Sequence, residues 1–481
     1  MSDNSQQGGH EFVRTLLQSD QLFFAKIDPL NASGAQGQAL LALNGTTLTV
    51  GVGATGVDPN GLHPLHIHGF PAGTPDSQVP TLADDADHDG FIEVAEGAHD
   101  YGPVLLSLNK NGSFPGGADT FLFTETYKLP STPKPNAAVP ALSELGLTPD
   151  IPLTQREIVI HGLTLPNELG LGGTNSSSIA PNEANGIPGY KLVLPVAAGE
   201  IEKFDFQTEK GFVADLVRSF GSGGEIKQGV DVDYYRFMNP DVKADGVDPL
   251  QHYLQNGAKE GRDPNAFFST NGYLAANPDV AKSGANPLQH YDQNGWKEGR
   301  DPGVHFDNEQ YLARNPDVKA AGVDPLLHFL QSGQAEGRHA ETASGRPTDI
   351  GAAKGFDAEY YLLANADVAK AASAAGGDTF AFALNHFNQY GWHESRDPNA
   401  VFDTKGYLAA YGDVRAANIN PLQHYDGYGF KEGRDASAHF DTKQYESHYT
   451  DVAAAGIDPM THYLQFGAVE GRSTFSDGHF G

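Results

Sequence analysis

Aromatic, apolar and polar positions recur in a fixed order through the second half of the chain. The clearest copy runs from Phe306 to Arg338 and places Tyr311, Leu326 and Phe329 among polar and turn-forming residues. Six copies share one register, because their histidines and their closing arginines are both spaced by 38, 38, 58, 38 and 38 residues. A period this regular is the signature of a repeat array. The histidines are His252, His290, His328, His386, His424 and His462, and the arginines are Arg262, Arg300, Arg338, Arg396, Arg434 and Arg472.

Each copy is expected to form three short helices. In the clearest copy, Asp307 is placed to cap the first helix, since an aspartate oxygen can accept from free backbone N–H groups. Pro316 cannot continue that helix but suits the first turn of the next one. Gly322 then ends the second helix, and Asp324-Pro325 begins a third. One copy buries too little apolar surface to fold alone, so neighbouring copies should complete its core.

Polar residues that recur once per copy are candidates for metal ligands. One histidine per copy lacks the second close ligand that a metal site needs, so we expect these histidines to bond locally to the Arg or Glu of the closing turn. A recurring aspartate is expected to cap helices, with calcium ligation as the alternative. The recurring aspartates are Asp241, Asp279, Asp317, Asp367, Asp413 and Asp451.

The first half, from about Glu11 to Phe206, has short β-rich runs separated by Gly, Asn and Ser. Strand-and-turn spacing of this kind is typical of an antiparallel sandwich. Loops rich in Pro, Gly and Asn are expected at Thr132–Leu153 and Gly170–Asn185. The predicted strands are Leu22–Ile27, Ala39–Leu43, Thr46–Val52, Arg156–Ile160 and Gly189–Pro195.

Histidines stand in two of the strand-like segments. His66 and His68 should point to the same face of one strand, because side chains alternate with a period of two. His161 ends a second strand and can supply a third imidazole. Three imidazoles on one face can bind copper or zinc. The alternative is that they only form hydrogen bonds at strand ends.

These residues carry a resemblance to a known family. The His-x-His-Gly strand at His66–Gly69, the arginine five residues before His161, and the closing segment Leu194–Ile201 follow one another in the family's order. This half therefore resembles the copper/zinc superoxide dismutase sandwich and the related CHRD-type domains. The resemblance implies that His66, His68 and His161 occupy the positions of three copper ligands.

The chain departs from the dismutase pattern at several positions that complete that family's chemistry. It has no cysteine, and Ala198 stands where the closing motif usually has one. Lys191 is the cation nearest to that motif, which lacks the family's arginine. The loop histidines His88 and His99 are not spaced as the metal ligands in the family's loop are. These departures disfavour dismutase turnover.

The segment from Asp85 to Glu96 matches the twelve-residue calcium loop, with Gly90 at its sharp turn. Carboxylates and one main-chain carbonyl would supply the hard oxygens that calcium prefers. A single loop of this kind favours a structural clip whose binding energy orders the loop. The alternative is a solvated acidic loop. The predicted calcium ligands are Asp85, Asp87, Asp89, Phe91, Glu93 and Glu96.

Composition narrows the possible partners and the location. A formal net charge of −30 disfavours nucleic acid, whose phosphates need a basic face. The absence of cysteine excludes disulfides, iron–sulfur clusters and thiolate catalysis. No apolar run is long enough to span a membrane, and the polar N-terminus lacks an ordinary secretory signal.

The second half resembles helical repeats, with the elements NPDV, DPLxHY and EGR, of bacterial surface proteins exported by type I secretion. An acidic, cysteine-free, glycine-rich chain without an N-terminal signal is similar to such exports. The resemblance implies an extracellular or cell-surface location.

We therefore predict a multidomain β plus α fold, in which an antiparallel dismutase-like β-sandwich is followed by all-α repeats. The fourth copy carries 20 extra residues, the difference between spacings of 58 and 38, so we expect two compact blocks of three copies. The predicted divisions are a disordered N-terminus (1–10), the sandwich (11–206), a linker (207–229), three repeats (230–338), an insert (339–355), three repeats (356–472) and a tail (473–481).

The favoured hypothesis is a secreted calcium-binding structural protein of the bacterial cell surface or extracellular matrix, which binds itself or a surface polymer. Half of the chain is repeat, and the enzyme-like half lacks much of its family's chemistry. One alternative is a copper-dependent superoxide dismutase-like enzyme tethered by the repeats. Another is a glycan- or surface-binding module. Calcium is the expected cofactor, with copper or zinc at the three histidines.

Overall fold

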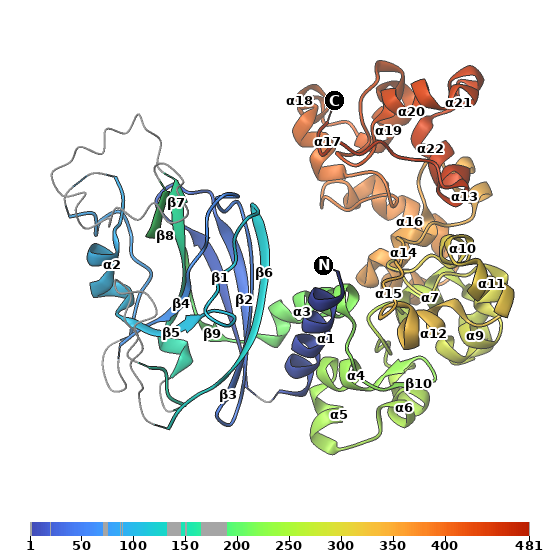
Figure 1. Cartoon of the computed structure of the whole chain (residues 1–481). Coiled ribbons are helices and arrows are strands. Elements are labelled where there is room, and N and C mark those ends of the chain that lie inside the picture. The colour runs from blue at the N-terminus through green and yellow to red at the C-terminus, as the bar shows by residue number, and fades with distance from the viewer. Residues whose placement is uncertain are drawn as a thin grey trace. The chain divides into compact units, whose positions relative to one another are not determined.

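Figure 1 shows the computed structural model of the chain, which describes residues 2–19, 21–70, 76–86, 88, 90–131, 146–149, 152–164 and 190–480. The chain divides into two compact units, Met1–Leu216 and Val217–Gly481. The first is an antiparallel β-sandwich and the second is helical, so the predicted fold class is confirmed.

The sandwich is one hydrogen-bonded path of antiparallel strands. Along that path the order is β5-β4-β7-β8-β1-β2-β3-β6, and β9 pairs with β1. β1 joins the two faces, because Leu22–Ile27 pair with β2 while Asp28 and Pro29 pair with β8. The strands are β1 (Leu22–Pro29), β2 (Gln36–Asn44), β3 (Thr47–Thr55), β4 (Leu65–His68), β5 (Val104–Leu108), β6 (Thr120–Lys128), β7 (Glu157–Thr164), β8 (Tyr190–Glu200) and β9 (Glu202–Lys203).

The main apolar core lies between the two faces of the sandwich. β4 contributes Leu65 and Ile67 to it, and β7 contributes Ile158 and Ile160, all fully buried. The alternate residues of these two strands point to the opposite face of the sheet. Helix α2 (Val94–Tyr101) and a smaller apolar cluster around Val159 cover that opposite face.

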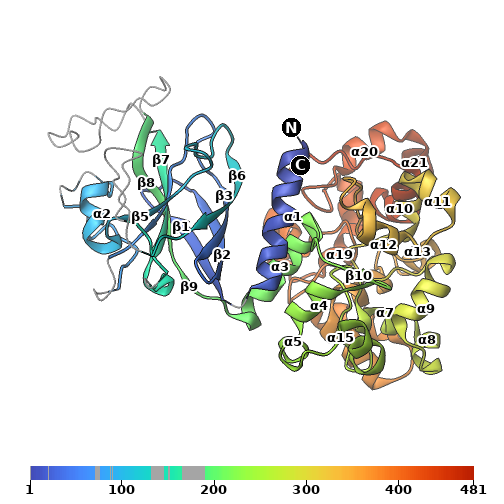
Figure 2. The ribbon, with the colours of Figure 1, turned by 60° about the horizontal axis from the view of Figure 1, so that its bottom comes forward.

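Helix α1 (Ser2–Gln18) packs on β2, β3 and β6, as Figure 2 shows. Phe12 and Leu16 are buried, four residues apart on one face of the helix. Gly51 of β3 makes room for the Phe12 ring, since a Cβ there would come within 2.2 Å of it. The polar composition of residues 1–10 predicts disorder, but residues 2–10 belong to this helix.

The five predicted strands are present as β1, β2, β3, β7 and β8. β5 and β6 are additional strands that the sequence reasoning missed. Helix α3 (Phe206–Phe220) occupies much of the predicted linker. Most of the two predicted loops, Thr132–Leu153 and Gly170–Asn185, lies outside the described residues.

The second unit repeats three short helices in each copy and begins with the pair β10 (Ile226–Lys227) and β11 (Val230–Asp231). The first helices are α4 (Val232–Met238), α7 (Thr270–Ala276), α10 (Asn308–Arg314), α14 (Ala358–Ala364), α17 (Thr404–Ala410) and α20 (Thr442–His448). The second helices are α5 (Pro240–Asp245), α8 (Pro278–Ser283), α11 (Pro316–Ala321), α15 (Ala366–Ala375), α18 (Gly412–Ala417) and α21 (Thr450–Ala455). The third helices are α6 (Pro249–His252), α9 (Pro287–Gln293), α12 (Pro325–His328), α16 (Thr379–His386), α19 (Pro421–His424) and α22 (Pro459–His462).

Among the described residues, two further α-helices of the second unit lie outside this pattern, and each copy also has a 3₁₀- or π-helical turn after its third helix. α13 (Pro347–Ala352) lies in the predicted insert, and α23 (Ala468–Glu470) lies near the end of the last copy, just before Arg472. Among the described residues, no helix is both long and apolar enough to cross a bilayer.

The helix ends of the clearest copy follow the sequence prediction. Asp307 accepts a hydrogen bond from Gln310 N at 2.8 Å, and Asp324 accepts one from Leu327 N at 3.1 Å. Gly322 ends α11 in the left-handed conformation, with φ of 64°. Short helices therefore follow one another because each has its own cap.

Each recurring histidine contacts the buried tyrosine of its own copy. In the third copy, Tyr311 Oη lies 3.0 Å from His328 Nδ1, and the other five pairs have the same distance. The partner is thus a tyrosine instead of the expected Arg or Glu. Gly333 packs against this hydroxyl, since a Cβ there would lie 2.4 Å from Tyr311 Oη.

Each closing arginine pairs with the recurring aspartate of its copy. Arg338 donates to the two carboxylate oxygens of Asp317 at 2.9 and 2.8 Å, and to Glu336 at 2.7 Å. The hydrogen bonds from Arg338 lower the pKa of Asp317 to about 2. The last two arginines also lie over tyrosine rings, as Arg434 does over Tyr411. The aspartate series is therefore paired with arginine, a partner that the capping interpretation did not include.

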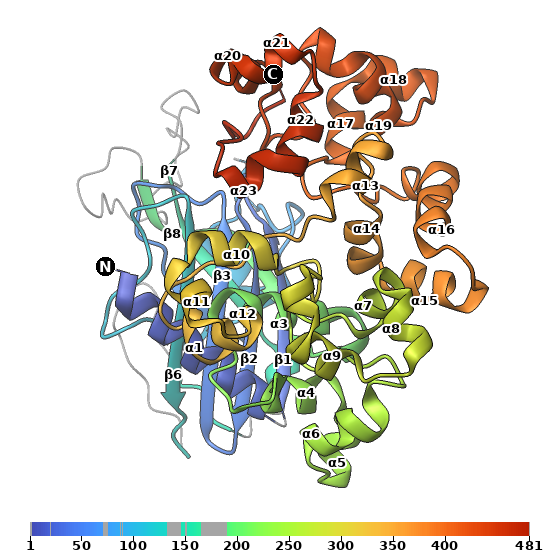
Figure 3. The ribbon, with the colours of Figure 1, turned by 90° about the vertical axis from the view of Figure 1, so that its right-hand side faces the viewer.

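The copies pack as one unit, without the expected division into two blocks near 339–355. α7 of the second copy packs against α14 and α15 of the fourth, as Figure 3 shows. Gly272 permits this approach, since a Cβ there would lie 3.0 Å from Leu363 Cα. The extra residues of the fourth copy lengthen α15 to 10 residues, and α13 packs on the π-helical segment Tyr463–Gly467. The insertions therefore connect the copies.

Candidate metal centre

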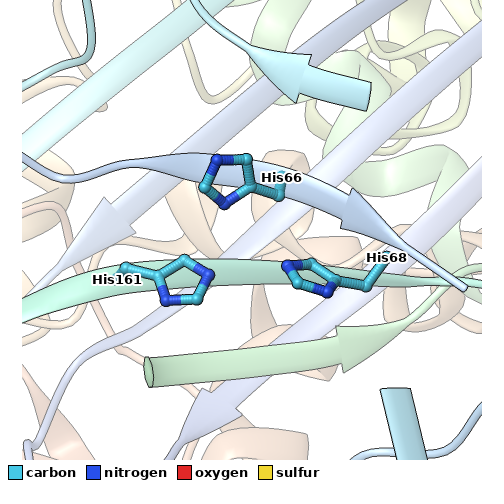
Figure 4. A group of neighbouring side chains, drawn as sticks. All are labelled: His66, His68 and His161. Carbon is cyan, nitrogen blue, oxygen red and sulfur yellow. The ribbon is translucent and has the colours of Figure 1, made fainter. Parts of the chain in front are cut away.

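Two neighbouring strands bring three histidines together. His66 and His68 lie on one face of β4, opposite Val159 and Glu157 of β7. The pairing of β7 with β8 shifts register around His161, whose ring lies beside the other two in Figure 4. The ring centroids are 5.6 Å apart for His66 and His68, 5.0 Å for His66 and His161, and 5.7 Å for His68 and His161.

The three imidazoles are enclosed and close enough to share an ion. One ring nitrogen from each lies within 4.8 Å of the others, and the residues are 0–1% exposed. Because a zinc–nitrogen bond is about 2.0–2.1 Å, nitrogens on one ion lie at most about 4 Å apart. Small side-chain adjustments are therefore enough for this group to hold a metal.

Hydrogen bonds orient two of the rings. His68 Nδ1 lies 2.9 Å from Gly102 O, and His161 Nδ1 lies 2.6 Å from Val193 O. A carbonyl only accepts, so each Nδ1 must carry the proton and each Nε2 is left with its lone pair. Both of these Nε2 atoms, and both ring nitrogens of His66, are buried without a hydrogen-bond partner among the described residues. Carbonyl partners on the far nitrogen are the usual support of metal-binding histidines.

Burial keeps the imidazoles neutral. Desolvation lowers the pKa of His66 well below its ordinary value, and the two neighbouring histidines lower it further. Desolvation likewise lowers the pKa of His68 to about 4 and that of His161 to about 3. A metal needs the neutral ring, so no proton has to be displaced from these nitrogens near pH 7.

Helix α2 covers the histidines. The ring of Tyr101, its last residue, lies 4.6 Å from the ring of His68, and Tyr101 Oη donates to Val94 O at 3.2 Å. Gly102, which ends the helix, supplies the carbonyl that orients His68. The end of α2 is therefore part of the histidine site.

The acidic loop leads directly into α2, and its described residues bond across it. Asp85 accepts from Gly90 N at 2.9 Å. Glu96, at the twelfth position of the motif, accepts from Ala86 N at 2.8 Å and from Glu93 N at 3.1 Å. Phe91 packs partly buried against Leu194. The other two predicted calcium ligands, Asp87 and Asp89, lie outside the described residues, so calcium binding stays a prediction.

Asn31 ties this loop to the sheet. Its side chain donates to Ile92 O at 3.0 Å and to Pro195 O at 2.8 Å, and it accepts from Ile92 N at 2.6 Å. Loop, helix and histidine-bearing sheet thus form one connected structure. Sequence reasoning missed Asn31, because nothing in its local pattern marks a contact 61 residues away.

His99, which the sequence places in a loop, lies in the last turn of α2 and outside the histidine group. Its Nε2 lies 3.5 Å from Asp84 and 3.4 Å from Asp100, and these three residues form a second group that could hold an ion. His99 is exposed while the two aspartates are partly buried, and the contacts within the group already account for its geometry.

Glu157 and Arg156 are buried charged residues that the sequence reasoning did not single out as functional. Glu157 lies opposite His68, and burial raises its pKa to about 8. Arg156 is 0% exposed, and desolvation lowers its pKa. The available signal was two adjacent charges at the start of an otherwise apolar strand.

Comparison with known protein families and with curated proteins finds no match. Among solved structures, a mutant of superoxide dismutase 5 from Candida albicans matches with 16% sequence identity and a TM-score of 0.16. The match covers 39% of this chain and 94% of that chain. A TM-score this low supports no inference about the histidine site.

Proposed function

We propose that the amino-terminal unit is a metal-binding domain in which His66, His68 and His161 hold one copper or zinc ion. The observation that carries this proposal is the convergence of three buried imidazoles whose Nε2 atoms have no hydrogen-bond partner among the described residues. Neutral imidazole suits both copper and zinc. Three protein ligands leave room for a fourth ligand on the ion.

The role of this ion is structural in the proposal. A dismutase needs a redox metal that superoxide can reach and a positive guide for the anion. The three histidines are 0–1% exposed, and the chain carries a formal net charge of −30. Enclosure and negative charge both disfavour rapid entry of an anion.

Calcium at the acidic loop belongs to the same proposal. Glu96 lies in the first turn of α2, and Gly102 at the other end of that helix holds His68. An ion that orders the loop would therefore also fix the carbonyl that orients a histidine. The proposed oxygen donors are Asp85, Asp87, Asp89, Phe91, Glu93 and Glu96.

For the whole chain, the proposed function is that of a secreted, calcium-binding structural protein of a cell surface or extracellular matrix. Support comes from the repeats, whose recurring Tyr, His, Arg and Asp side chains bond to one another within each copy. Residues used in this way stabilise a scaffold. A second copy of the chain or a surface polymer is the proposed partner.

Metal analysis of the full chain tests the histidine centre. Metal is removed from the protein with a chelator. The protein is then loaded with copper or zinc, washed, and analysed by elemental mass spectrometry. We expect one tightly held ion per chain, lost in both His66→Gln and His161→Gln because each removes a required imidazole. His99→Gln, which changes a histidine outside the group, should retain the ion.

Two outcomes would overturn parts of this proposal. Equal retention of the ion in parent and His66→Gln proteins would remove the metal site. Superoxide turnover by the copper-loaded parent that disappears in His66→Gln would replace the structural role with a dismutase activity.

A further inference from the structure

Buried carboxylates gather where the second, third and fourth copies meet. Asp301 follows the closing arginine of the second copy, while Asp307 and Glu309 lie at the start of α10. One oxygen from each of these three carboxylates lies within 4.8 Å of the others. Asp301 and Asp307 are each 1% exposed, so two of the three charges lie inside the protein.

One oxygen of Asp301 has no protein partner among the described residues. Its Oδ1 accepts from Asn308 N at 2.9 Å, whereas its Oδ2 is buried without a hydrogen bond. Asp307, in contrast, accepts from Gln310 and from Ser344. A buried carboxylate oxygen without a partner costs free energy, so a ligand at this position would be stabilising.

The fourth copy adds negative charge to the same place. The backbone N–H of Asp301 favours the charged form of Glu359, whereas Asp357 and Glu309 repel it. Arg346 is the positively charged residue that attracts Glu359. Desolvation, followed by charge repulsion, raises the pKa of Glu359 to about 8, whereas Glu309 is exposed to solvent.

The other copies offer an internal comparison. The fifth and sixth copies keep both aspartates, as Asp397 with Asp403 and as Asp435 with Asp441, but they have lysine at the position of Glu309. The side chains at this position occupy equivalent places, since Glu309 lies against Gly299 and Lys443 lies against Gly433. In those copies the chain has a cation, the lysine, at this position. In the third copy it supplies another carboxylate instead.

We propose that Asp301, Asp307 and Glu309 bind a calcium ion. Carboxylate oxygens from several segments are the ligands that calcium prefers, and calcium tolerates irregular geometry. The ion would join the end of the second copy to the start of the third. This site is separate from the histidine centre and from the Asp85–Glu96 loop, and it does not depend on either.

Calcium titration of the full chain tests this site. In a Glu96→Gln background, which removes the closing carboxylate of the amino-terminal loop, the chelator-treated protein is titrated with calcium chloride in a calorimeter. We expect one bound calcium ion per chain and a higher melting temperature of the repeat unit. Adding Glu309→Lys should abolish that binding and raise the calcium-free melting temperature, because the lysine replaces the ion.

Two further variants keep the test decisive. Lys443→Gln, at the equivalent position of the sixth copy, should leave calcium binding unchanged. Glu309→Gln keeps the shape of the side chain and should weaken binding even if Glu309→Lys folds poorly. Calcium affinity that is the same in Glu309→Gln as in its background would overturn the site. So would the absence of any calcium-induced shift in the Glu96→Gln protein, which would mean that protons alone satisfy the carboxylates.

Discussion

Histidine serves two different roles in this chain, and the difference lies in what surrounds each ring. His328 and its five equivalents take a tyrosine hydroxyl at Nδ1. His68 and His161 use Nδ1 on a carbonyl and keep Nε2 unpaired among the described residues. The sequence predicts the first role as local hydrogen bonding but names the wrong partner, because the tyrosine lies 17 residues away in the third copy.

The contact between Gly333 and Tyr311 gives a prediction at this scale. Gly333→Ala would place a Cβ 2.4 Å from Tyr311 Oη, an overlap that should destabilise the repeat unit by about 1–3 kcal/mol. Tyr311→Phe should cost about 1 kcal/mol by removing the hydrogen bond to His328. The double variant should be more stable than the sum of the two losses predicts, because removing Oη also removes the clash.

Urea denaturation of the four proteins measures this coupling. Tyr428→Phe, which alters an exposed tyrosine of the fifth copy, is the matched control and should have no measurable effect. Additive losses in the double variant would show that contact with Tyr311 Oη is not the reason why position 333 needs glycine.

At the scale of helices and strands, local chemistry is what the sequence predicts best. The caps Asp307 and Asp324 and the terminator Gly322 are where their residue types predict them, because capping needs only neighbours in sequence. Helix α1 and strands β5 and β6 were missed. The burial of Phe12 in α1 depends on the space above Gly51, which a local pattern does not contain.

The arginine–aspartate pairs predict how the second unit responds to acid. Hydrogen bonds from Arg300 lower the folded-state pKa of Asp279 to about 2, below the value near 3.9 of an unfolded chain. The pair therefore contributes stability above about pH 4, and this contribution is lost as the pH falls through about 2. Asp279→Asn should destabilise the unit at pH 7, by a small amount because the side chain is 63% exposed.

Melting temperatures of parent and Asp279→Asn proteins at pH 7 and near pH 2 check this sign. The two proteins should differ at pH 7 and converge in acid. A difference that stays constant over this range would mean that the aspartate acts through its shape and not through its charge.

At the scale of the whole molecule, the two-part fold follows from the two periodicities of the sequence. The position of the histidine group also follows, since strand alternation places His66 and His68 on one face. The arrangement of the copies does not follow, because an insertion that looks like a linker in sequence can instead build a contact. Here the lengthened α15 packs on α7, and Thr379 Oγ1 donates to Ala275 O at 2.7 Å across the expected break.

This contact predicts that the copies unfold together. Ala275 of α7 is 0% exposed and belongs to the same apolar core as residues of the fourth copy. Ala275→Leu should therefore overpack this contact and destabilise the unit by about 1–3 kcal/mol. Hydrogen exchange should then increase in residues 356–472 as well as in 230–338, since the two halves share the damaged core. Ala321→Leu, at an exposed helical position, is the matched control and should change neither half. Faster exchange confined to 230–338 would instead restore the division into two independent blocks of three copies.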